Sequence, residues 1–80
     1  MDKVIYLIDK ERYTKQDVQD LTQKDLEKWV AEEDYNGDYT IMKIDANGYN
    51  SISDAIKEEL GFIDPCDVHE NYFVFAFGIK

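Results

Sequence analysis

The stretch DYNGDYTIMKID, residues 34–45, spaces oxygen-bearing side chains much as a calcium-binding loop does. An EF-hand loop takes side-chain oxygens from positions one, three, five and twelve. The residues at those positions are Asp34, Asn36, Asp38 and Asp45. One hypothesis for this protein is therefore a calcium- or other metal-binding regulatory domain that uses this loop.

Three features of the same loop count against calcium. Position six, where the EF-hand needs glycine for a sharp turn, is Tyr39. Position twelve is Asp45, which is one methylene shorter than the bidentate glutamate of an EF-hand. The residues that follow, 46–48, are a turn signal and not the start of a second helix. We therefore prefer a helix-to-strand turn whose Asp and Asn side chains bond nearby backbone groups, and we expect no metal and no cofactor.

Cys66 and His69 are a second candidate for chemistry, because they stand three residues apart among several acids. Zinc would need further ligands, and the chain has no second cysteine or histidine. A small enzyme with a Cys66–His69 nucleophile is a third hypothesis, but the pattern supplies no orienting group for the histidine. We interpret the pair as a packed thiol and an exposed loop histidine. The prediction is that the protein is not an enzyme, with no catalytic residue assigned.

Tyrosine and acidic residues are interleaved around two Asn-Gly turns in the middle of the chain. Tyrosine is common at interfaces because it joins apolar area to a polar tip. Acidic neighbours would attract and orient a basic partner. The predicted partner-binding residues are Tyr35, Asp38, Tyr39, Asp45, Tyr49, Asp54 and Glu58. The alternative interpretation is that these acids only keep the protein soluble.

The charge of the chain narrows the class of partner. Eighteen acidic and nine basic side chains give a net charge of −9, and residues 34–70 alone hold nine acids and two bases, or −7. Lys and Arg supply affinity for phosphates, so direct nucleic-acid binding is disfavoured, as is binding to an anionic membrane. A protein partner with a basic surface remains. In a sharper form of this hypothesis, spaced carboxylates imitate phosphates, and the protein inhibits a DNA- or RNA-binding protein as a nucleic-acid mimic.

The expected compartment follows from cysteine content and apolar runs. One cysteine excludes an internal disulfide framework. The longest apolar run near the N-terminus, VIYLI, is shorter than the apolar core of a signal peptide, and no run approaches the ~20 residues of a membrane span. We predict a cytoplasmic protein with one small domain, residues 1–80.

Short runs rich in β-branched and aromatic residues predict three strands. They cover residues 3–8, 39–44 and 72–79. The near-continuous apolarity of the first strand indicates burial on both of its faces.

Hydroxyl residues followed three positions later by aspartate predict helix starts. Thr14 and Thr22 begin either two short helices, over 14–20 and 23–33, or one helix with a wide apolar face. Ser51 begins a further helix, which ends at Gly61. Residues 62–71, which contain Pro65, are predicted to form a loop.

The order strand, helix (or two), strand, helix, strand predicts an α+β or small α/β fold, with a three-stranded sheet and its helices packed on one face. Strand order stays open. Because so few helices can hardly cover both faces, we expect one apolar face to be uncovered and to suit a homodimer.

Overall fold

The computed structural model describes residues 2–37, 40–61 and 64–78. Within these residues three strands and four helices follow in the order β1–α1–α2–β2–α3–α4–β3. The strands are β1 (Val4–Asp9), β2 (Ile41–Asp45) and β3 (Tyr72–Phe77). The helices are α1 (Lys15–Val18), α2 (Gln23–Asn36), α3 (Ile52–Glu59) and α4 (Pro65–Asn71).

The strands form one antiparallel sheet in the order β2-β1-β3. Val4 at the start of β1 lies opposite Asp45 of β2 and Phe77 of β3. The first strand of the chain is therefore the central one. This arrangement confirms the predicted three-stranded sheet of a small α+β fold.

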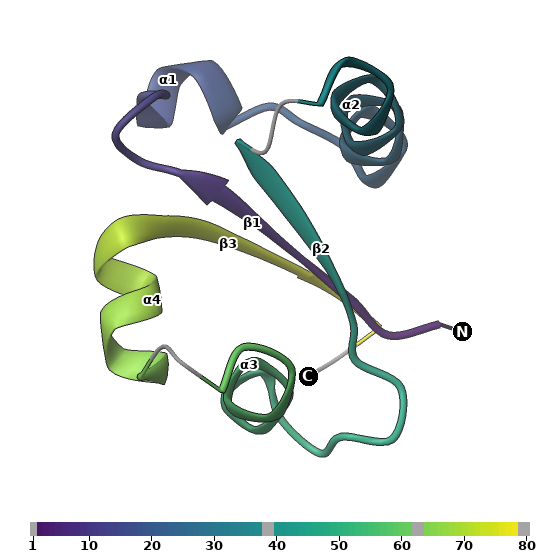
Figure 1. Cartoon of the computed structure of the whole chain (residues 1–80), viewed down its shortest axis with the longest axis vertical. Coiled ribbons are helices and arrows are strands. Elements are labelled where there is room, and N and C mark those ends of the chain that lie inside the picture. Colours follow the sequence, from purple (N-terminus) through teal and green to yellow (C-terminus); the bar gives the residue numbers. More distant parts are fainter. Residues whose placement is uncertain (1, 38–39, 62–63, 79–80) are drawn as a thin grey trace.

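Both faces of the sheet carry helices, with α1 and α2 on one face and α3 and α4 on the other (Figure 1). The prediction that all helices pack on one face, with the opposite face uncovered, is thus wrong in this respect. The segment between β1 and β2 passes over one face, whereas the segment between β2 and β3 passes over the other. β1 lies between these two layers, which is why five consecutive apolar residues, Val4–Ile8, are all buried.

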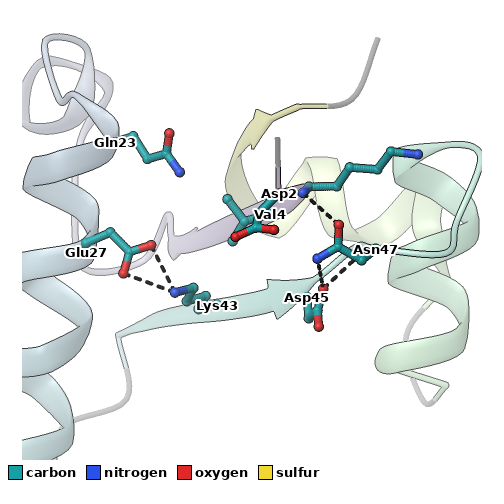
Figure 2. A pocket seen from close by; sticks show the side chains of 8 residues that line it. Asp2, Val4, Gln23, Glu27, Lys43, Asp45 and Asn47 are labelled. Carbon is teal, nitrogen blue, oxygen red and sulfur yellow. Dashed lines mark hydrogen bonds and ion pairs between the residues drawn. The ribbon is translucent and has the colours of Figure 1, made fainter.

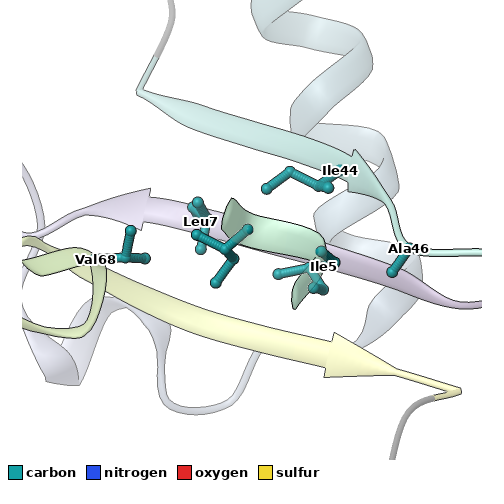
Figure 3. Close-up of a cluster of buried hydrophobic side chains, with 7 residues drawn as sticks. Ile5, Leu7, Ile44, Ala46 and Val68 are labelled. Carbon is teal, nitrogen blue, oxygen red and sulfur yellow. The ribbon is translucent and has the colours of Figure 1, made fainter. Parts of the chain in front are cut away.

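Each face has its own hydrophobic cluster. The cluster between the sheet and α3–α4 is shown in part in Figure 3, where Ile5, Leu7 and Ile44 of the sheet lie near Val68 of α4. The opposite cluster contains β1 residues of the other parity together with helix residues of α1 and α2. Its buried members are Val4, Tyr6, Ile8, Val18, Leu26 and Ile41. Alternate side chains of one strand thus build two separate cores.

Capping boxes start the first two helices where the sequence predicts. The Asp17 amide donates to Thr14 Oγ1 at 3.3 Å, and the Thr14 amide donates to Asp17 Oδ2 at 2.8 Å. Thr22 and Asp25 repeat the pattern at 3.2 and 3.0 Å. The hydrogen bonds from the threonine amides hold the pKa of both carboxyls below its usual range. The interpretation with two separate helices is therefore the correct one of the two alternatives.

Helix α4 replaces much of the predicted loop. Asp64 caps its start by accepting from the Cys66 amide at 3.0 Å, and Pro65 occupies the first helical position. Proline suits that position because its missing N–H would have no intrahelical partner there. Residues 62 and 63 of the predicted loop lie outside the described residues.

A buried carboxylate joins the end of α2 to the start of β2. Glu33 is only 7% exposed, and its oxygens accept from Trp29 Nε1 at 2.8 Å and from the Thr40 amide at 2.9 Å. The Thr40 hydroxyl donates to the same carboxylate. The helix then ends at Gly37, which has a left-handed φ of 78° and donates its amide to the Glu33 carbonyl oxygen at 2.8 Å.

No helix in the described part of the chain has both the length and the hydrophobicity needed to cross a lipid bilayer.

Candidate functional site

A groove of about 450 Å³ follows the outer edge of β2. All five residues of the strand, Ile41–Asp45, line it. Val30 of α2 adds an apolar side chain from one face of the sheet, and Glu59 and Leu60 at the end of α3 add an acidic and an apolar one from the other. The groove therefore combines an apolar lining with carboxylates.

Tyr49 stands among three acidic residues beside this groove. Its hydroxyl donates to Glu59 Oε1 at 2.8 Å, and its ring packs against the core under α3 and α4. That hydrogen bond, followed by burial and by the negative charges of Glu59, Glu58 and Asp45, raises the pKa of the Tyr49 phenol. We call Asp45, Tyr49, Glu58 and Glu59 the acidic rim. Two of its carboxylates, those of Asp45 and Glu59, also line the groove.

Hydrogen bonds fix the turn that carries two members of the acidic rim, Asp45 and Tyr49. Asp45 Oδ1 accepts from the amide of Asn47 at 3.0 Å and from its side-chain Nδ2 at 2.8 Å. Asn47 Oδ1 in turn accepts from the Lys3 amide at 3.1 Å, and Lys3 Nζ donates to the Tyr49 carbonyl oxygen at 3.2 Å. Asp45 and Tyr49 are therefore linked to Lys3, which directly precedes β1.

A second, polar pocket of about 320 Å³ adjoins the groove at Asp45 and Lys43. Figure 2 shows Gln23 and Glu27 of α2 on one side of it, and Lys43 and Asp45 of β2 below. Lys43 Nζ lies 2.9 Å from Glu27 Oε1 and donates to Oε2 at 3.0 Å. The phenol of Tyr6, at the centre of the sheet, donates to the same carboxylate.

The electrostatics of this pocket do not suit proton transfer near neutral pH. Burial and the bond to Glu27 raise the pKa of the Tyr6 phenol above its ordinary value of 10.0. The hydrogen bonds from Tyr6 and Lys43 lower the pKa of Glu27. Tyr6 therefore stays protonated and Glu27 stays ionised, whereas a general acid or base works best with a pKa near the operating pH. The pairing also neutralises Lys43, which is the one basic residue among those that line the groove.

The structure brings together only some of the predicted partner-binding residues. Asp45 and Glu58 lie near enough to Tyr49 for their negative charges to raise the pKa of its phenol, and all three belong to the acidic rim. Asp54 lies on the first turn of α3, one turn before Glu58, and both are exposed. Tyr35 is 91% exposed on the last turn of α2, near the start of β2, so the length of that strand separates it from Asp45. The predicted residues Asp38 and Tyr39 lie outside the described residues.

The predicted partner-binding residues do not include three participants of this surface, namely Glu59, Glu27 and Lys43. Glu59 follows Tyr49 by ten residues, and only the fold of α3 over the turn brings the two together. Glu27 and Lys43 meet across α2 and β2 in the same way. The one signal in the sequence was that Glu59 sits next to the predicted Glu58.

The candidate calcium loop is described only in part. Positions eight to twelve of the loop form β2, so Asp45 ends a strand and no helix follows it directly. The side chains of Asp34 and Asn36 and the whole of Asp38 lie outside the described residues. Among the side chains that are described, no three or more His, Cys, Asp or Glu residues gather as a metal site would require.

Cys66 and His69 lie on α4 and not on a loop, and both are exposed. The backbone oxygen of His69 accepts from Lys10 Nζ at 2.7 Å. Cys66 is a free thiol, and its exposure contradicts the expectation that it is packed.

Comparison of this chain with protein-family models, curated proteins and solved structures finds no match.

Proposed function

We propose that this protein is a non-enzymatic binding module whose acidic rim and β2 groove receive a basic segment of a partner protein. The observation that carries the proposal is the position of Asp45 and Glu59, which belong to the rim and also line a groove with apolar residues on both sides of the sheet. A basic side chain of the partner would contact these carboxylates, while apolar side chains beside it would fill the groove next to Val30 and Leu60. Such a site uses charge for orientation and apolar burial for affinity.

The charge of the groove favours a cationic partner. Lys43 is the one basic residue among its lining residues, and Glu27 neutralises it. Asp45 and Glu59 have no cationic side chain within ion-pair distance among the described residues. Their negative charge is therefore available to a partner.

The narrower form of the proposal is mimicry of a nucleic acid, in which the carboxylates of Asp45, Asp54, Glu58 and Glu59 occupy phosphate positions on a DNA- or RNA-binding protein. The net charge of −7 over residues 34–70 supports it. The exposed free thiol of Cys66 suits a reducing compartment, and we include a cytoplasmic location in this proposal.

The test is capture of partners by the immobilised protein from a lysate of the cells that produce it, with elution by rising salt. Wild-type protein is compared with a triple variant, Asp45→Asn, Glu58→Gln and Glu59→Gln, in which each side chain keeps its shape and loses its charge. After Glu59→Gln, the side-chain amide oxygen at position 59 can still accept the bond from Tyr49. We expect the triple variant to lose the basic proteins that wild-type protein retains and releases at moderate salt.

A charge-matched control separates a specific surface from total charge. Glu11→Gln, Asp20→Asn and Glu32→Gln remove three exposed acids outside the acidic rim. The control should capture the same proteins as wild type. If the two triple variants lose binding equally, or neither loses it, the rim is not the binding site.

Nucleic-acid mimicry is tested by a displacement experiment on each captured protein. A labelled DNA or RNA is bound to it, and the present protein is added. Displacement by wild-type protein, but not by the rim variant, would support mimicry, and simultaneous binding of both would exclude it.

A further inference from the structure

β3 is an edge strand whose outer backbone groups have no strand partner in the described sheet. In an antiparallel ladder, alternate residues direct their N–H and C=O groups toward the neighbouring strand. The amide of Lys10 donates to the Asn71 oxygen at 3.1 Å, which continues the β1–β3 register by one pair. Odd-numbered residues of β3 therefore bond to β1, and Tyr72, Val74 and Ala76 direct their backbone groups outward.

The two edges of the sheet differ in how well they are protected against pairing with a further strand. The β2 edge carries Lys43 and Asp45 and lies in the groove between two helices. Charged side chains are a usual means by which proteins prevent other strands from pairing with an edge. β3 has no charged residue in its six positions and no proline, so its sequence, YFVFAF, lacks these protections.

The side chains of β3 are also less covered than those of the central strand. Val4–Ile8 of β1 are all buried, whereas all six residues of β3 are half-buried. Phe73, Phe75 and Phe77 lie on the α1–α2 face of the strand. The helices thus leave a stripe of three aromatic side chains partly open at this edge.

We propose that two copies of this chain pair through β3 in antiparallel register, about a two-fold axis at Phe75, to form one continuous six-stranded sheet. In this register Phe75 of one copy lies opposite Phe75 of the other, and Phe73 lies opposite Phe77. On the other face, the larger Val74 lies opposite the smaller Ala76. The outward backbone groups of Val74 and Ala76 exchange hydrogen bonds with those of the other copy.

The register places the three phenylalanines at the positions where side-chain contacts between the two β3 strands are closest. The outward residues Val74 and Ala76 form the hydrogen-bonded pairs, so the phenylalanines fall at the non-hydrogen-bonded positions, where opposing side chains come closest. The two stripes then merge into one apolar surface on the α1–α2 face, where opposed aromatic side chains stabilise the pairing of the strands.

A second copy fits this edge better than a different protein does, for reasons of charge and symmetry. With a net charge of −9, most surfaces of two copies would place acid against acid. β3 offers six consecutive positions without any of the eighteen acids. The three phenylalanines are also placed symmetrically about Phe75, so two antiparallel copies of the strand present matching side chains to each other. An isologous two-fold interface requires this symmetry.

This dimer is independent of the proposed function, because β3 and β2 form opposite edges of the sheet. Pairing at β3 leaves both grooves free, one at each end of the six-stranded sheet. The predicted homodimer would therefore use an edge of the sheet and not one of its faces.

The first test is the molar mass of the full chain by sedimentation velocity over a hundredfold range of concentration. We expect the mass to approach twice the chain mass as the concentration rises, and Ala76→Pro, which removes an outward amide, to stay monomeric. Lys43→Pro makes the same change at an outward position of the β2 edge and should still dimerise. A monomer at every concentration, or Ala76→Pro dimers like those of wild type, would overturn the proposal.

Cross-linking tests the register, and it does not depend on whether the proline variants fold. In a Cys66→Ser background, Phe75→Cys should form a disulfide dimer on mild oxidation, because opposed non-hydrogen-bonded pairs lie within disulfide distance. Phe73→Cys alone should not, but it should cross-link when mixed with Phe77→Cys. Equal self-cross-linking at positions 73 and 75, or none at either, would contradict the pairing.

Discussion

Replacement of Glu33 by alanine should lower the free energy of unfolding far more than replacement of an exposed glutamate by alanine would. Its oxygens accept from Trp29 Nε1, the Thr40 amide and the Thr40 hydroxyl, and Thr40 is only 8% exposed. Without Glu33, the two buried donors of Thr40 lose their acceptor. The half-buried indole N–H of Trp29 can turn to water and contributes less.

The magnitude follows from those donors. A buried donor left without a partner costs about 1–3 kcal/mol, so Thr40 alone accounts for about 2–6 kcal/mol. Removing a buried carboxylate also removes the free energy of its desolvation, which offsets part of this loss. We therefore expect Glu33→Ala to lower the free energy of unfolding by about 2–4 kcal/mol, which is a large share of the stability of a small domain.

The assay is urea unfolding followed by far-UV circular dichroism, because Trp29 fluorescence would itself change with the substitution. Glu32→Ala is the matched control. It makes the same change at an exposed position of the same helix, with the same gain in helix propensity, and should stay within about 0.5 kcal/mol of wild type. A loss below about 1 kcal/mol for Glu33→Ala would refute the reasoning, since it would mean that Thr40 finds other acceptors.

Two further predictions concern the sheet. Because the pKa of Tyr6 in the folded state lies above its ordinary value of 10.0, the stability that Tyr6 confers should be complete below that pH and fall as the pH rises above it. Urea unfolding from about pH 8 to about pH 11 should therefore show a smaller alkaline loss for Tyr6→Phe than for wild type, and equal losses would contradict the shift. At Gly78, an added Cβ would lie 2.5 Å from the Asp2 backbone oxygen, and φ is +79°. Gly78→Ala should thus lower the melting temperature more than Gly37→Ala, where φ is +78° but no atom of the described residues lies within 4 Å of the added Cβ. Equal shifts would argue against the contact at Gly78.

Local chemistry explains which elements could be predicted from the sequence. Thr14 and Thr22 each bond an aspartate three residues later, so both helix starts are written within four residues of sequence. The strand VIYLI is equally plain, because only a strand buried on both faces needs so continuous an apolar run. Helix α4 differs from the prediction because Val68 is the one buried residue among its described side chains, so the segment shows no apolar periodicity.

The remaining differences have non-local causes. Which face of the sheet a helix covers depends on the path of the connections. The sequence of α3 does not indicate that this helix covers the face opposite α2. The contact between Tyr49 and Glu59 and the bond from Tyr6 to Glu27 join residues that become neighbours only after the sheet forms. The burial of Glu33 has a non-local cause as well, since the residue type does not indicate whether a glutamate is buried or exposed.

The central place of β1 has a consequence for the order in which the protein is made and folded. During synthesis, VIYLI emerges before both of its neighbouring strands, since Val4 pairs with Asp45 and Phe77. Until then its apolar side chains have only α1 and α2 to cover one side. Closure of such long loops slows folding, and an exposed strand invites association with other chains. A nascent chain of this protein should therefore depend on chaperone protection until β3 has left the ribosome.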